Sequence, residues 1–187
     1  MAFARLIFRV LLGTLILLAV IGMFLPDTAQ VERSIVINAP ADKIFPHLNS
    51  MRAFHAWSPW TQVDPDTSYT FEGPEQGVGS RMTWSSGDER VGQGSQEITA
   101  SAPNQSVDTH LVFGDEGEGD ARFVLEPEGQ GTRIRWEFET EFGWDLFGRY
   151  VGLMLDTMIG TSYDRGLKEL KSRIEQPEAP AEPDSNA

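Results

Sequence analysis

The chain has 187 residues, a formal net charge of −13 and no cysteine. The missing cysteines exclude disulfides, thiolate metal sites and cysteine nucleophiles. The acidic balance makes nucleic acid a poor partner, because binding it needs a basic stripe that neutralises phosphates. An anionic membrane surface should repel the chain as well, so any membrane contact is expected to come from the apolar start of the chain.

An apolar segment opens the chain. The run from Val10 to Leu25 carries no charge, and extending it back to Leu6 adds only Arg9, which can snorkel to an interface. Twenty residues at about 1.5 Å each span about 30 Å, the thickness of a hydrocarbon core. We therefore predict a transmembrane anchor over residues 1–25.

The charges that flank this segment predict its orientation. Arg5 and Arg9 lie on its N-terminal side, whereas Asp27 and Glu32 open the other side. By the positive-inside rule, the N-terminus is cytoplasmic and the domain extracytoplasmic, which gives a single-pass membrane protein. A cleaved signal peptide is the alternative; the length of the run and the lack of a clear A-x-A site stand against it.

Composition divides the rest of the chain. Residues 26–30 form a short linker, and residues 176–187 are rich in proline and acid. The latter segment cannot bury enough apolar surface to fold, so it is predicted to be disordered. Residues 31–175 contain no internal repeat and no second linker, and we interpret them as one domain.

The domain is predicted to contain a strand, two short helices, six further strands and a long helix. The first strand, Val31–Ile37, alternates and is rich in β-branched residues. The short helices are expected over 41–48 and 51–57, and the further strands over 68–72, 80–85, 91–100, 107–113, 121–126 and 132–142. Gly92 and Gly94 suggest a bulge. The closing helix runs from about Asp145, its expected N-cap, to Glu175.

This order predicts an α+β fold, in which a curved antiparallel β-sheet wraps on a long C-terminal helix and an N-terminal transmembrane helix precedes it. In the last strand, Ile134, Trp136 and Phe138 share one face, which should pack on the helix. The opposite face is charged, which predicts cross-strand ion pairs in water rather than catalytic carboxylates. Its members are Arg133, Arg135, Glu137, Glu139 and Glu141.

Several short strings, taken in order over about residues 31–175, resemble the START-like (SRPBCC) superfamily and its polyketide cyclase/dehydrase and lipid-transport type. They are Ile37-Asn38-Ala39-Pro40 with Ile44-Phe45, Trp57-Ser58-Pro59-Trp60, Gly77-Val78-Gly79, 91–95, 132–136 and 154–171. The resemblance implies a helix-grip fold with a cavity between sheet and helix. Members of the family bind lipids, sterols, polyketides or plant hormones, and a minority catalyse cyclisation or dehydration. Catalytic residues differ among members, so the resemblance implies none here.

Aromatic and methionine side chains at inward or mouth positions are the candidate ligand-binding residues. Aromatic rings supply apolar area, and the flexible thioethers of methionine suit irregular ligands. The alternative for each of these residues is a place in an ordinary core. The set comprises Trp57, Trp60, Met82, Trp84, Phe113, Phe123, Trp136, Phe138, Met154 and Met158.

Trp57 and Trp60 flank Pro59 in a loop, and their amphipathic indoles suit an entrance where apolar surface meets water. The alternative is that both plug the end of the core. The histidines, His47, His55 and His110, show no metal-binding spacing, so we expect no metal site. We also expect no cofactor, and we assign no catalytic residue.

The leading hypothesis is a membrane-anchored module that binds a hydrophobic or lipid-like small molecule, with the membrane contacted through the N-terminal helix. One alternative is a cyclase or dehydratase that uses an acid or base in the pocket. The other is a non-catalytic interaction or stress protein with a filled core.

Overall fold

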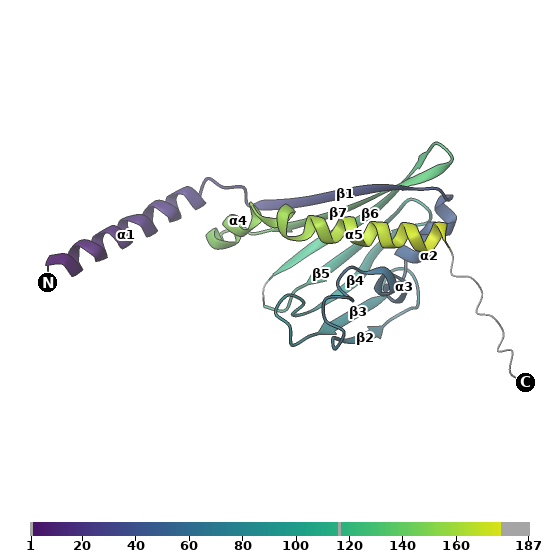
Figure 1. The fold of residues 1–187 in the computed structure, drawn as a ribbon, viewed down its shortest axis with the longest axis horizontal. Helices are drawn as coiled ribbons and strands as arrows, with labels where there is room; N and C mark the ends of the chain where they lie inside the picture. The colour runs from purple at the N-terminus through teal and green to yellow at the C-terminus, as the bar shows by residue number, and fades with distance from the viewer. Residues whose placement is uncertain (1, 116, 177–187) are drawn as a thin grey trace, which may run out of the picture.

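The computed structural model describes residues 2–115 and 117–176, and its centre is a seven-stranded antiparallel sheet in the order β1-β7-β6-β5-β4-β3-β2 (Figure 1). The strands are β1 (Thr28–Ile37), β2 (Ser68–Glu72), β3 (Arg81–Ser85), β4 (Gln93–Ala102), β5 (Ser106–Val112), β6 (Glu118–Glu128) and β7 (Gly131–Glu141). The helices are α1 (Ala2–Gly22), α2 (Ala41–Leu48), α3 (Met51–Trp57), α4 (Leu146–Gly152) and α5 (Leu155–Glu175). The predicted α+β class and element order are confirmed.

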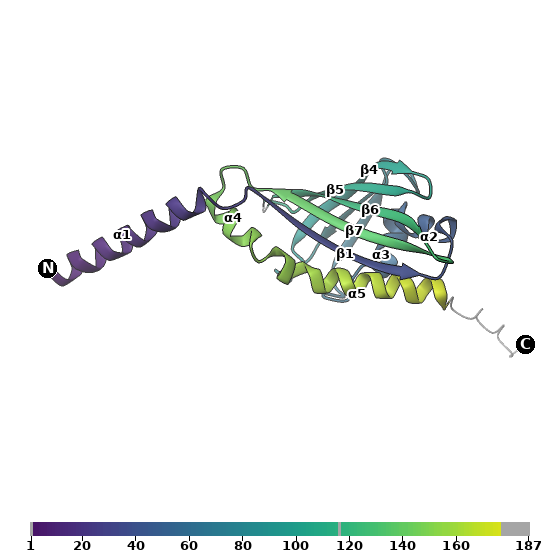
Figure 2. The same ribbon diagram turned by 90° about the horizontal axis from the view of Figure 1, so that it is seen from above.

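One face of the sheet carries the helices. Helix α5 lies along the sheet beside β1, and α2 and α3 pack between α5 and the other strands (Figures 1 and 2). Helix α1 projects away from the domain at the end where α4 lies. Among the described residues it is the one helix long and apolar enough to cross a membrane, a test that a signal sequence near the N-terminus also passes.

The two faces of β7 are divided as the alternation predicts. Ile134, Trp136 and Phe138 are buried against the helices. On the other face, Arg135 pairs with Glu126 of β6 and with its own-strand neighbour Glu137. The charged residues of this face therefore form a partly solvated surface, whereas the apolar set forms the core.

The connection between α1 and the sheet is shorter than the sequence suggests. Residues 28–30, expected in a linker, belong to β1 and pair with Glu139–Glu141 of β7. The ladder extends this far because β7 itself continues to Glu141, which offers partners to the backbone of β1. Only residues 23–27 separate the helix from the strand.

The closing helix is divided in two. Asp145 caps α4 as expected, and its carboxylate accepts a hydrogen bond from the Phe147 backbone N–H at 3.0 Å. The helix then breaks at Leu153 and Met154 before α5 begins. A Cβ on Gly152 would lie 2.6 Å from the ring of Phe142, so α4 packs closely on the residue that follows β7, whereas α5 runs along β1.

The bulge lies elsewhere than predicted, in β4 between Ile98 and Ala100. Gly94 instead allows close packing, because a Cβ there would lie 2.5 Å from the ring of Trp84. The predicted disordered tail falls almost wholly outside the described residues.

Candidate ligand-binding site

The space between the sheet and the helices is filled by an aromatic cluster centred on Trp136. The Tyr163 ring of α5 stacks on Trp136 with centroids 3.7 Å apart, and the Phe123 ring of β6 lies 5.0 Å away. Phe54, Trp57 and Trp60 complete the cluster, with ring centroids 5.5–5.9 Å from that of Trp136. We refer to these six residues as the aromatic cluster.

Backbone geometry places these rings together. Phe123 and Trp136 face each other as register partners on β6 and β7, while Phe54 and Trp57 lie three residues apart, on one face of α3. On α5, a Cβ at Gly166 would come within 3.1 Å of the Trp136 ring, so this glycine lets the helix approach the cluster.

The indole N–H groups differ in their partners. Trp57 donates to the His47 carbonyl at 3.0 Å, and Trp84 donates to the Val91 carbonyl at 3.2 Å. Trp136 Nε1 is buried and has no hydrogen-bond partner among the residues that the structure describes. Leaving a buried donor unpaired costs about 1–3 kcal/mol, so this N–H is available to an acceptor that enters the interior.

A second group of rings lies on the remaining strands. The ring of Phe113 lies 6.2 Å from those of Trp84 and Phe138. The interior also holds a polar pair that the sequence analysis did not single out: Gln96 donates to the Thr109 hydroxyl at 3.0 Å, and both side chains are buried. The available signal was that Gln96 shares the inward period-two face of Ile98.

The predicted lining residues divide into three groups. Trp57, Met82, Phe123, Trp136 and Phe138 are buried, and Trp60, Trp84 and Phe113 are half-buried. Met154 and Met158 are 61 % and 59 % exposed, because Leu155 and Ile159 occupy the positions that face the core. These two methionines do not line the interior. Trp57 is also corrected: it is 1 % exposed and lies in the core, not at the entrance predicted for it.

Titratable groups are scarce in this interior. Within the described ranges, the buried polar side chains are serines, threonines and Gln96, apart from Tyr163 of the cluster. Burial raises the pKa of Tyr163, so its hydroxyl stays protonated at neutral pH. His55 lies outside the cluster with its ring 4.3 Å from that of Tyr69, and desolvation lowers the pKa of His55.

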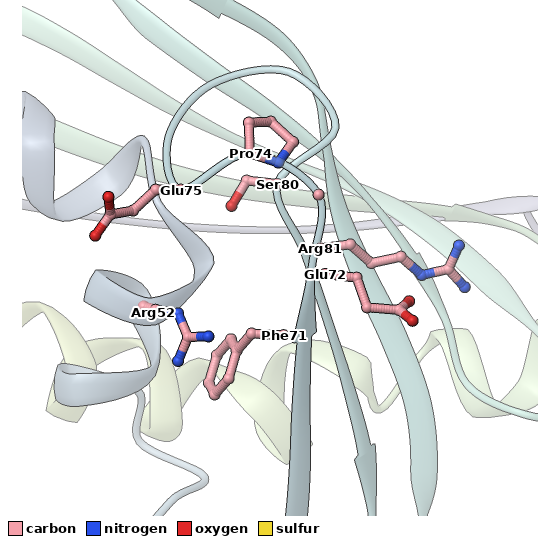
Figure 3. Close-up of a pocket in the computed structure, with 8 residues that line it drawn as sticks. Arg52, Phe71, Glu72, Pro74, Glu75, Ser80 and Arg81 are labelled. Carbon is pink, nitrogen blue, oxygen red and sulfur yellow. The ribbon is translucent and has the colours of Figure 1, made fainter.

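Two surface hollows on the described part of the chain do not correspond to the predicted cavity. One, of about 30 Å³, lies between α3 and the β2–β3 hairpin, where the Arg52 guanidinium stands 4.6 Å from the centre of the Phe71 ring (Figure 3). Its remaining lining includes Glu72, Glu75 and Arg81, a charged set that suits no apolar molecule. A shallow groove of about 290 Å³ on β3 and β4 includes Trp84 and no other predicted lining residue.

A curved antiparallel sheet closed by a long C-terminal helix is the helix-grip arrangement of START-like proteins. Three solved structures share it: the Aha1 dimer from Colwellia psychrerythraea, a protein from Thermobifida fusca and the protein TTHA0849 from Thermus thermophilus. Their TM-scores are 0.54, 0.61 and 0.58, at 19 %, 16 % and 16 % identity. Each match covers 80 % of this chain, and 98 %, 95 % and 99 % of the respective structure. At this identity the likeness concerns the fold.

The sequence profile of the family described as polyketide cyclase/dehydrase and lipid transport matches residues 28–175. The chain belongs to this family, as its sequence predicts. No curated protein matches it.

Proposed function

We propose that the chain is a membrane-anchored module that binds a hydrophobic small molecule carrying at least one hydrogen-bond acceptor, between the sheet and α5. The observation that carries the proposal is the unpaired N–H of Trp136, which lies buried among aromatic rings. Family membership supports a ligand-binding module of this kind. A ligand oxygen near this N–H would remove the cost of the unpaired donor.

A ligand requires room that the aromatic cluster now fills. Trp60 is the member that is only half-buried, and it lies in the irregular segment between α3 and β2. Its ring meets those of Trp136 and Tyr163 edge to face at about 6 Å. We propose that outward movement of Trp60 opens the site and that its indole remains at the entrance.

Native mass spectrometry of the full chain, extracted from membranes in detergent, tests the proposal by detecting a co-purified molecule. Trp136→Phe should abolish or strongly reduce that mass, since it keeps a ring and removes the free donor. Trp57→Phe is the matched control, because Trp57 is equally buried but already donates to His47. Retention of the molecule by both variants, or its absence from the wild type, would contradict the proposal.

The anchor is a separate part of the proposal. Its support is the length and apolar character of α1 together with the flanking Arg5 and Arg9. Intact-mass analysis of membrane-extracted protein should give a chain that begins at or near Met1. A chain that begins near residue 26 would instead indicate a cleaved signal peptide.

A filled core favours a second candidate, a non-catalytic interaction or stress protein. Its support is the close stacking of Trp136 on Tyr163. The two candidates differ in the mass experiment, because a permanently filled core carries no ligand. Catalysis of the cyclase or dehydratase type has less support, since Tyr163 is the one fully buried titrating group in the described interior, and the half-buried His47 and His55 lie outside the aromatic cluster.

A further inference from the structure

Outside α1 itself, most exposed large apolar side chains of the described chain lie in the stretch 144–158, which includes α4. Beyond α1 and the two residues that follow it, Val78 is the one large exposed apolar side chain outside residues 144–158 in the part of the chain that the structure describes. Within that stretch, Trp144 is 83 % exposed and Phe147 is 78 % exposed. Leaving so much apolar area in water is unfavourable, and such a patch marks a contact. We define the α4 surface as Trp144, Phe147, Leu153, Met154 and Met158.

Helix α4 is joined to α1 by hydrogen bonds and by close packing. Arg149 donates to the carbonyls of Gly22, Met23 and Leu25 at 3.4, 3.3 and 3.1 Å, which satisfies acceptors that the end of a helix leaves free. Tyr150 donates to the Leu18 carbonyl at 2.7 Å. A Cβ on Gly22 would lie 3.2 Å from the Tyr150 ring, so the glycine permits this approach.

These contacts fix the depth of α4 relative to a bilayer. Helix α1 has 21 residues, which at about 1.5 Å each just cross a hydrocarbon core of about 30 Å. Its last turn, which Tyr150 reaches at Leu18, therefore lies at the boundary between hydrocarbon and headgroups. Helix α4 lies at that same level, beside the end of α1 (Figures 1 and 2).

We infer that the α4 surface lies in the interfacial layer of the membrane and forms a second contact with lipid. The inference depends on the proposed anchoring of α1 and adds a contact that the anchor does not supply. Tryptophan and tyrosine are the side chains that membrane interfaces enrich, and the stretch carries both, at Trp144 and Tyr150.

We expect the α4 surface to contact the acyl chains and the neutral interfacial groups of the lipid, and not to depend on charged headgroups. The chain carries a net charge of −13, and the members of the α4 surface are uncharged. The contact should therefore form with zwitterionic lipid and should not require anionic lipid.

Depth measurements on the full chain can test this arrangement, because the absence of native cysteine permits single labels. Nitroxide labels would be placed at Phe147→Cys, Met154→Cys and Met158→Cys, with Leu11→Cys inside α1 as the buried reference. Val78→Cys is the control, since Val78 is exposed and apolar but lies in the β2–β3 connection, away from α1. The protein is reconstituted in phosphatidylcholine vesicles, and collisions with oxygen and with a water-soluble nickel chelate are compared by power saturation.

The expected result is that position 147 favours oxygen over nickel nearly as strongly as position 11 does, with the preference decreasing through 154 to 158. Position 78 should favour nickel. If labels at positions 147 and 154 favour nickel, as position 78 should, while position 11 favours oxygen, the inference fails and the proposed membrane anchor remains supported. If 11 also favours nickel, both fail. Low access to both reagents at 147, with dipolar broadening between labels, would mean that a second copy covers the surface, and this would also overturn the inference.

Discussion

The two ends of the C-terminal helical segment contain similar apolar side chains in opposite surroundings. From Tyr163 onward in α5, Tyr163, Leu167 and Leu170 are buried in the core. In α4 and the first turn of α5, Phe147 and Met158 are exposed. The periodic pattern is the same along the segment, so the difference arises from where the sheet and the short helices reach. One end closes the core, and the other faces outward beside α1.

The largest difference between the two ends should appear in alanine substitutions on α5. Leu167→Ala removes a fully buried side chain and should lower the free energy of unfolding by about 2–5 kcal/mol. Met158→Ala is the matched control on the same helix and should change it by less than about 0.5 kcal/mol in detergent. Chemical denaturation followed by circular dichroism measures both. Equal effects would mean that the two ends of the segment do not differ in packing.

A smaller effect is expected where the two ends meet, at Gly160. Arg33 of β1 lies across this glycine and donates to both carboxylate oxygens of Asp156 at 2.7 and 3.0 Å, while Asp164 lies 3.4 Å away. A Cβ at Gly160 would overlap the guanidinium, so Gly160→Ala must displace Arg33. In an Arg33→Ala background the same change meets no obstacle and should stabilise α5 by up to about 1 kcal/mol, through helix propensity alone.

A double-mutant cycle in the free energy of unfolding isolates this coupling. We expect Gly160→Ala to be less favourable in the wild type than in the Arg33→Ala background by at least about 0.5 kcal/mol. Thr161→Ala, at the exposed neighbouring position, should give the same value in both backgrounds. An additive cycle at Gly160 would show that Arg33 does not couple to the first half of α5 at this position.

The smallest expected effect is a dependence of the free energy of unfolding on pH, through two histidines of the short helices α2 and α3. Desolvation lowers the pKa of His55 below its usual 6.5, and desolvation together with Arg173 lowers the pKa of His47. Because the folded state disfavours the charged ring, the unfolded chain binds more protons in this window. Stability should therefore be complete above about pH 6.5 and decline as pH falls below it.

The contribution of each histidine can be separated in the urea midpoint. His55→Phe should reduce the loss of stability between pH 7 and pH 5, and adding His47→Gln should reduce it further. The ratio of oxygen to nickel access at the α4 surface should not change over the same range. An unaltered pH profile in the double variant would assign the pH dependence to other groups.

The sequence predicts the sheet and its faces well, because period-two alternation in β7 directly reflects burial on one side. It predicts the closing helix less well. The apolar spacing in α4 and α5 indicates which side chains share a helical face, but it does not indicate what that face contacts. Met154 and Met158 were therefore expected in a cavity and lie on the outside.

The candidate site depends on geometry that no local pattern encodes. Trp57 and Trp136 are both tryptophans at inward positions, and only the placement of the His47 carbonyl distinguishes a satisfied N–H from a free one. The linker prediction failed for a related reason. Thr28–Gln30 has little strand character alone and pairs because β7 continues beside it.

The bonds from Arg149 to the end of α1 have a mechanical consequence. Only residues 23–27 lie between α1 and β1, and α4 is hydrogen-bonded to the end of α1. The helix and the domain should therefore move together as one rigid unit. If α1 spans a membrane as proposed, it cannot tilt without turning α4 with it. Transmembrane helices adjust their tilt to the thickness of the surrounding bilayer. Membrane thickness would thus set the angle at which the sheet stands above the lipid.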